Sequence, residues 1–94
     1  MNLPSFDYIL EVMEKAGLTA SEMIMLLPIG RATFYCWKRG ETISDMLRYR
    51  LSIARCKVIE MAVEKGRLPL TEDVPRRMRL TSIQKILSEV KAGR

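Results

Sequence analysis

The side chains best suited to chemistry in this sequence are the cations that begin at Arg31. Residues 1–30 hold one lysine and four acidic residues, whereas residues 31–94 hold fifteen cations and seven acidic residues. The net charge of +5 is therefore unevenly distributed, and the change falls at the start of the run RATFYCWKRG. Cations concentrated in one part of a chain favour a polyanionic partner. A solvated basic surface is the plainer explanation, so the asymmetry alone only raises the odds of nucleic-acid binding.

Residues for catalysis or metal binding do not accompany these cations. The sequence has no histidine, no glycine-rich phosphate loop, and no serine or cysteine with a plausible base beside it. Cys36 and Cys56 are far apart and unpaired in sequence, which supports neither a zinc motif nor a disulfide framework. We therefore expect no enzyme activity, no cofactor, no metal and two reduced structural thiols.

Length and composition indicate one small all-α domain. The chain has 94 residues, of which 48% are hydrophobic and 29% charged, with few glycines and prolines. Its apolar residues recur at helical spacing, and no run alternates as a strand would. The longest apolar run, residues 23–27, is too short to span a bilayer, and no charged leader is present. We expect a cytoplasmic protein that does not associate with membranes.

A short helix should precede the basic run. Thr19 is followed three residues later by Glu22, which is the spacing of a capping box, so the helix should begin near Ala20. Pro28 lacks an amide hydrogen and restricts the residue before it, so this helix should end by Leu27.

A second short helix should carry the basic run itself. Phe34 and Trp37 are three residues apart and share one face, which predicts that they belong to the core. Lys38 and Arg39 fall in the last turn, where cations favour the helix dipole, and Gly40 follows as a C-terminal cap.

The stretch from Leu18 to Gly40 resembles the helix-turn-helix of lambda-repressor-like regulators of the Xre and Cro type. Six residues fall on the family's positions for the helix entry, the turn and the core of the second helix: Leu18, Thr19, Glu22, Ile29, Gly30 and Phe34. The run RATFYCWKRG is in register with the family's recognition helix. Two positions depart from the pattern, because Ile24 replaces a small residue and Pro28 replaces a glycine.

This resemblance implies a sequence-specific double-stranded DNA-binding regulator, expected to be a repressor from a bacterium or phage, with its second helix in the major groove. The residues that it places at base edges are Arg31, Ala32, Cys36 and, beside them, Tyr35. The residues that it places on phosphates are Thr33, Lys38 and Arg39. The alternative is a protein-interaction module of the same shape, such as an antitoxin or a phage-encoded inhibitor, whose partner would be a toxin or another regulator.

The remaining residues should supply three further helices. The expected helices lie near residues 5–16, 20–27, 31–39, 45–65 and 76–91. Residues 66–75 contain two prolines with alternating apolar residues, which indicates a packed extended connector. We treat residues 1–94 as one domain, in which residues 1–43 form the helix-turn-helix core and residues 44–94 form the long helix, the connector and the C-terminal helix.

The long helix carries more apolar surface than one small domain is expected to cover. Five of its residues follow alternating steps of four and three, the spacing of a packed helical seam: Leu47, Leu51, Ala54, Val58 and Met61. Three residues of the C-terminal helix are assigned to the same interface: Leu80, Ile83 and Leu87. We expect a homodimer through this surface, which would read two half-sites about one DNA turn apart. The plainer alternative is that the C-terminal helix covers the long helix within the chain.

A cationic cluster begins the C-terminal helix. Arg76, Arg77 and Arg79 lie in its first turn, where positive charge opposes the helix dipole. The cluster indicates either an anionic partner, such as a phosphate backbone, or a solvated patch.

Overall fold

The structure is a computed structural model that describes residues 3–71 and 73–93. Within these ranges the chain forms five helices and no strand: α1 (Phe6–Lys15), α2 (Ala20–Leu26), α3 (Arg31–Lys38), α4 (Met46–Glu64) and α5 (Arg76–Lys91). The all-α prediction is confirmed, and every helix boundary lies within one residue of the expected position. Residues 1, 2, 72 and 94, which belong to the predicted domain or its connector, lie outside the described ranges.

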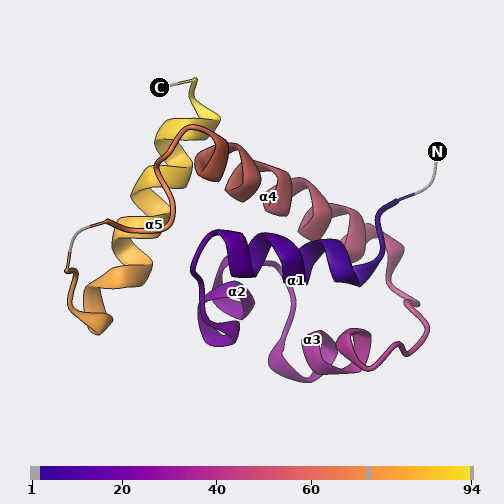
Figure 1. Cartoon of the computed structure of the whole chain (residues 1–94). Helices are drawn as coiled ribbons and strands as arrows, with labels where there is room; N and C mark the ends of the chain where they lie inside the picture. The colour runs from indigo at the N-terminus through magenta and orange to yellow at the C-terminus, as the bar shows by residue number, and fades with distance from the viewer. Residues whose placement is uncertain (1–2, 72, 94) are drawn as a thin grey trace.

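Helix α1 lies at the centre of the arrangement. It packs against α4 on one side and α3 on the other, while α2 packs against α3 (Figure 1). Helix α5 packs against α4, at the end of the molecule away from the N-terminus. All five helices contribute buried apolar side chains to a single core. No helix formed by residues 3–71 and 73–93 is long and apolar enough to cross a membrane.

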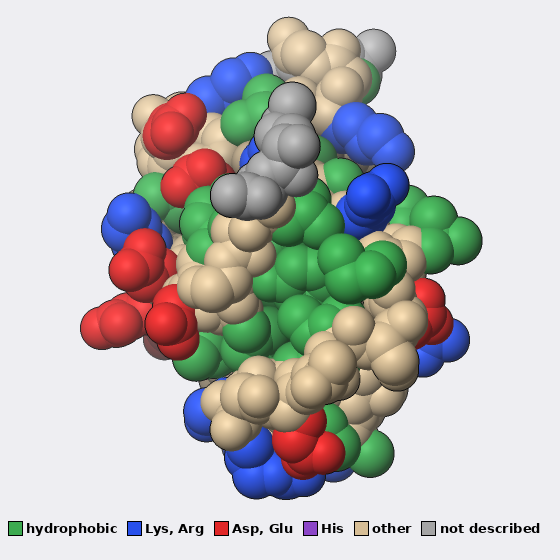
Figure 2. Space-filling model, turned by 90° about the vertical axis from the view of Figure 1, so that its right-hand side faces the viewer, with side chains coloured by type: hydrophobic (Ala, Val, Ile, Leu, Met, Phe, Trp, Pro, Cys, Tyr) green, Lys and Arg blue, Asp and Glu red, His purple; other side chains and the backbone are tan. Residues whose placement is uncertain are grey.

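The segment of residues 3–5, just before α1, lies over the start of α4. The hydroxyl of the buried Tyr49 donates a hydrogen bond to the carbonyl oxygen of Pro4. A hollow at this end is lined by Leu3, Phe6, Ile43, Met46 and other residues, and Figure 2 shows hydrophobic side chains across the middle of this end. The α3–α4 connection and the N-terminal segment therefore share one packed surface.

Helix α4 has two apolar faces with different surroundings. Its inner face is buried against the rest of the chain and consists of Tyr49, Ser52, Ile53, Cys56, Ile59 and Ala62. Ser52 is accommodated because its hydroxyl donates to the carbonyl oxygen of Arg48 at 2.9 Å. The predicted seam lies on the opposite face, where Leu47 is 72% exposed and Leu51 and Met61 are also exposed. The expectation that one domain would not cover all of this apolar surface agrees with the structure.

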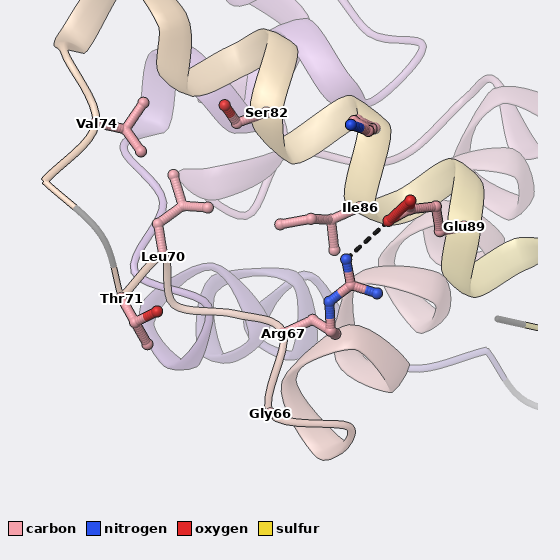
Figure 3. Close-up of a pocket in the computed structure, with 9 residues that line it drawn as sticks. Gly66, Arg67, Leu70, Thr71, Val74, Ser82, Ile86 and Glu89 are labelled. Atoms are coloured by element: carbon pink, nitrogen blue, oxygen red, sulfur yellow. Dashed lines mark hydrogen bonds and ion pairs between the residues drawn. The ribbon is translucent and has the colours of Figure 1, made fainter.

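The connector between α4 and α5 is packed, as the sequence predicts. Leu68 is buried, and Arg67 donates to a Glu89 carboxylate oxygen of α5 at 2.7 Å. Figure 3 shows Leu70 and Ile86 pointing toward each other across a hollow between the connector and α5. The connector therefore holds α5 in place along α4.

Gly17 allows the connector to approach the turn between α1 and α2. Its φ is +66°, and a Cβ at this position would lie 2.9 Å from Cβ of Pro69. Gly40, which follows α3, also has a positive φ of +89°, but a Cβ there would meet nothing within 4 Å. The two glycines thus share the backbone requirement and differ in packing.

This difference makes a matched pair of substitutions. Gly40→Ala should lower the free energy of unfolding by about 1 kcal/mol, the cost of a left-handed conformation for alanine. Gly17→Ala should cost about 1 to 3 kcal/mol more, because Pro69 must also move. Urea denaturation of both variants and the wild type measures the difference. Equal losses would show that the contact with Pro69 does not constrain the turn.

Candidate nucleic-acid interface

The start of α2 is capped as its sequence predicts. The Thr19 side chain accepts a hydrogen bond from the Glu22 amide at 3.1 Å, and the Thr19 amide donates to a Glu22 carboxylate oxygen at 2.9 Å. The helix ends at Leu26, because Leu27 adopts an extended conformation ahead of Pro28. Residues 27–30 then connect α2 to α3, which begins at Arg31.

The inner face of α3 is fixed by aromatic packing. Phe34 and Trp37 are buried, as predicted. The Phe34 ring meets Phe6 of α1 edge-to-face at 5.2 Å between centroids, and Trp37 meets Tyr49 of α4 in the same way at 5.4 Å. Edge-to-face aromatic pairs add specific geometry to apolar burial. These contacts set the rotation of α3 about its axis, and so decide which residues face outward.

The predicted base-contact residues share the outer side of this helix. Arg31 and Ala32 are exposed in the first turn, and Tyr35 and Cys36 follow them one turn later, half-buried. Residues four apart lie one above the other on a helix, so the four side chains form two adjacent rows. None of them belongs to the buried part of the core.

The predicted phosphate-contact residues are more dispersed. Lys38 and Arg39 are exposed at the end of α3, where Arg39 is the C-terminal cap residue. Thr33 is half-buried, because it lies one turn before the buried Trp37 on the same row. Thr33 therefore lies at the margin between the outer side and the core.

The cations of α3 differ in how available they are to an anion, because one of them is in an ion pair. Arg39 donates to Glu41 through both Nε and Nη2, at 3.1 and 2.7 Å, and Nη2 also lies 3.3 Å from Sγ of Cys36. The hydrogen bond from Arg39 holds the pKa of Glu41 below its ordinary value. Figure 2 shows acidic and basic side chains together at the lower end of the molecule, where α3 lies. A phosphate at Arg39 would have to compete with this carboxylate.

Arg31 and Lys38 are more available to an anion. Arg31 makes one long hydrogen bond, at 3.4 Å, to the exposed hydroxyl of Ser21. The Lys38 ammonium lies 5.7 Å from the centre of the Tyr35 ring, a cation–π contact that does not neutralise its charge. The first and last turns of α3 thus each present a cation toward solvent.

The three arginines at the start of α5 differ in their surroundings. Arg76 and Arg77 are exposed. Arg79 instead donates to both carboxylate oxygens of Glu22, at 2.8 and 3.2 Å, and to the Gly17 carbonyl oxygen at 2.9 Å. The hydrogen bond from Arg79 is the largest cause that lowers the pKa of Glu22. Arg79 therefore holds α5 against the start of α2, so neither of the two interpretations of the cluster, an anionic partner or a solvated patch, applies to this arginine.

The predicted dimer interface is partly at the surface. The seam residues Leu47, Leu51, Ala54 and Met61 are exposed and Val58 is half-buried. In α5, Leu80 and Leu87 are half-buried. Ile83 is 0% exposed, so its assignment to an interface is wrong: the helical turn that carries it faces α4 and the core.

The two thiols lie apart from each other, one in the core and one on α3. Cys56 is buried in the core, and its burial raises the pKa of the thiol to about 12. Cys36 is half-buried on α3. Among the side chains that the structure describes, no three of the types Cys, Asp and Glu are placed to hold a metal ion.

Three long-range contacts that frame this region were not found from the sequence. They are the hydrogen bonds from Arg79 to Glu22, from Arg55 to the Leu26 carbonyl oxygen at 3.1 Å, and from Tyr49 to Pro4. The contact between Arg79 and Glu22 is indicated in the sequence by three cations at the start of a helix, where they oppose the dipole. The other two involve backbone carbonyls, whose partners depend on tertiary packing.

Comparison with known proteins found no relative of this chain. The chain matches no family model, and no curated protein or solved structure is significantly similar to it.

The Arg79 contacts generate a prediction about stability and pH. Arg79→Met should lower the free energy of unfolding by about 1 to 3 kcal/mol at neutral pH, because two hydrogen-bonded partners lose a charged donor. The exposed Arg77→Met is the control and should change it by less than about 0.5 kcal/mol.

The pH dependence of this loss follows from the sign of the Glu22 shift. A carboxyl whose pKa is lower in the folded state stabilises that state at pH values above its unfolded pKa, and this stabilisation disappears as the pH falls through the folded value. The difference between wild type and Arg79→Met should therefore shrink below pH 4.5, the ordinary pKa of Glu22. Denaturant titrations at several pH values measure it, and a difference independent of pH would contradict the role of the ion pair.

Proposed function

We propose that this protein is a sequence-specific double-stranded DNA-binding regulator that places α3 in the major groove. One observation carries the proposal: aromatic anchors fix α3 at the edge of the fold, so that Arg31, Ala32, Tyr35 and Cys36 share an outward side. A helix held by one face and exposed on the other is the element that a major groove admits.

The types of residue on the outer side suit DNA. Arginine can donate two parallel hydrogen bonds to a guanine edge, and an alanine methyl can contact a thymine methyl. Arg31 and Ala32 lie in the first turn of α3, the part of a recognition helix that reaches deepest into the groove. Lys38, at the opposite end of the helix, is placed to meet a phosphate.

The surrounding charges are compatible with this orientation. The acidic side chains of α1, Asp7, Glu11 and Glu14, are exposed on a helix that contributes its buried face to the core beside α3. Glu41 is the acidic group closest to the proposed contact residues in sequence, and it is paired with Arg39. Binding should therefore rest on Arg31 and Lys38 more than on Arg39.

Substitution of Arg31 tests the base contact. Arg31→Ala should weaken binding to the preferred site by about 1 to 3 kcal/mol and relax the preference at one base pair, because a bidentate contact is lost. Affinity for scrambled duplex should change much less. The site is first selected from a random duplex library, and binding to selected and scrambled duplexes is then measured by fluorescence anisotropy.

The control is Lys15→Ala, which removes an exposed cation from the end of α1. It should leave the preference between duplexes intact. If the chain selected no site, or if Arg31→Ala left cognate and scrambled binding equally unchanged in a folded protein, α3 would not be a recognition helix.

Phosphate contacts have a different signature. Lys38→Ala should weaken binding to all duplexes alike and reduce the slope of log affinity against log salt by about one unit. A change in base preference with an unchanged salt slope would contradict the assignment of Lys38 to a phosphate.

The pairing of Arg39 predicts a gain of affinity. Glu41→Gln should strengthen binding to all duplexes by about two- to fivefold, because Arg39 is released and a repulsive carboxylate is removed. Glu64→Gln, at the end of α4, is the control for the change in net charge. Titrations at fixed salt compare the two variants, and equal gains would show that net charge alone is responsible.

A further inference from the structure

The exposed seam of α4 borders a groove whose charges define its partner. The groove lies between α4 and α5, with a volume of about 520 Å³, and its lining includes Leu51, Ala54 and Val58 of the seam. Leu87 comes from α5 and Leu26 from α2. Leu47 and Met61 extend the apolar surface along α4 beyond the groove at either end. This face is concave and apolar, and in the single chain it stays open.

Cations flank the seam along most of its length. If the seam residues occupy the a and d positions of a heptad pattern, the flanking e and g positions hold Arg48, Arg50, Arg55 and Lys57. All four are exposed. Arg48 is paired with Asp45 at 3.4 Å. Among the residues that the structure describes, no ion pair involves Arg50, Arg55 or Lys57, so these three supply the free positive charge. The first acidic residue at a flanking position of α4 is Glu64, at the end of the helix.

The groove itself repeats this charge pattern. Its charged lining residues are Arg55 from α4 and Lys91 from α5, so both walls are positive. Arg55 donates one hydrogen bond to the Leu26 carbonyl oxygen, which holds its guanidinium at the groove and leaves other N–H donors unused. A guanidinium held in this way is prepared to bind a carboxylate.

The same charges disfavour a second copy of the chain. In a parallel pair of α4 helices, Arg50 of one copy would lie opposite Arg55 of the other. In an antiparallel pair, Arg50 would approach Lys57, and Arg48 would approach Arg55. Both the parallel and the antiparallel orientation bring like charges together across the apolar contact, which opposes association. The spacing of the seam residues predicts a homodimer here, whereas the flanking cations favour a different occupant.

We propose that the α4–α5 groove binds an acidic amphipathic helix of a partner protein. The apolar side of that helix would cover Leu51, Ala54 and Val58, and its flanking carboxylates would meet Arg50, Arg55, Lys57 and Lys91. A helix laid in a hydrophobic groove is a common mode of recognition, with flanking charges setting the choice of partner. The two-walled shape of the groove suits a helix better than a flat lipid surface.

A designed peptide tests the proposal on the full chain. The probe is a labelled synthetic helix of about three heptads with leucine at every a and d position and glutamate at every e and g position. The matched peptide carries lysine in place of each glutamate. Repulsion between like charges discourages either peptide from pairing with itself. The glutamate peptide should bind with a Kd at or below about 100 µM, and the lysine peptide at least about tenfold more weakly.

Substitutions then locate the contact. Lys57→Glu should weaken binding of the glutamate peptide by about tenfold and strengthen binding of the lysine peptide, because a single exposed charge is reversed. Lys15→Glu makes the same change in net charge on α1, which packs against the opposite face of α4, and should leave both peptides unaffected. Circular dichroism confirms that each variant is folded.

Each other outcome overturns the proposal. Equal binding of both peptides, or no binding of the glutamate peptide, would show that the flanking cations do not select a partner. A dimer of the chain alone at tens of micromolar, in sedimentation at about physiological salt, would assign the groove to a second copy. Binding to vesicles of anionic phospholipid without binding of the peptide would assign it to a membrane surface. None of these measurements uses DNA, so the result is independent of the proposed regulator function.

Discussion

The orientation of α3 depends on the burial of Phe34 and Trp37 against Phe6 and Tyr49. A helix of eight residues is too short to be stable alone, so tertiary packing must hold it. Because both anchors lie on one side, that packing also fixes the opposite side toward solvent. The burial of Phe34 and Trp37 thus determines which basic side chains of α3 are exposed. Any function of α3 depends on this orientation.

The ion pair between Arg79 and Glu22 extends this constraint to the C-terminal helix. Glu22 has two roles, because its carboxylate caps α2 and also accepts from Arg79. The start of α5 is therefore linked to the helix that precedes α3. The position of one of the cations that oppose the dipole of α5 is explained by this contact. Arg79 destabilises the start of its own helix but stabilises the packing of α5 against α2.

Local signals in the sequence were enough to predict the elements. The capping box at Thr19, the stop at Pro28 and the glycines after α1, α3 and α4 each act within a few residues, so the helix boundaries follow from them. The surroundings of α4 could not be predicted in the same way. Its apolar residues cover two faces, and only the packing of α1 and α5 decides that Ile53 and Ile59 face inward while Leu47 and Leu51 face solvent. The assignment of Ile83 to an interface is wrong for a similar reason, because the sequence of α5 does not reveal which of its apolar residues meet the core.

The two proposed surfaces are both positively charged, but they differ in where the apolar residues lie relative to the cations. On α3, cations stand among residues that can read base edges, and apolar anchors lie behind them in the core. On α4, cations flank an apolar stripe that is itself exposed. A nucleic acid offers phosphates without an extended apolar surface, so it satisfies the first arrangement and leaves the second uncovered. An acidic amphipathic helix satisfies the second, because it supplies carboxylates and apolar side chains at matching spacing. The position of apolar residues relative to the cations, more than the net charge, therefore distinguishes the partners of the two surfaces.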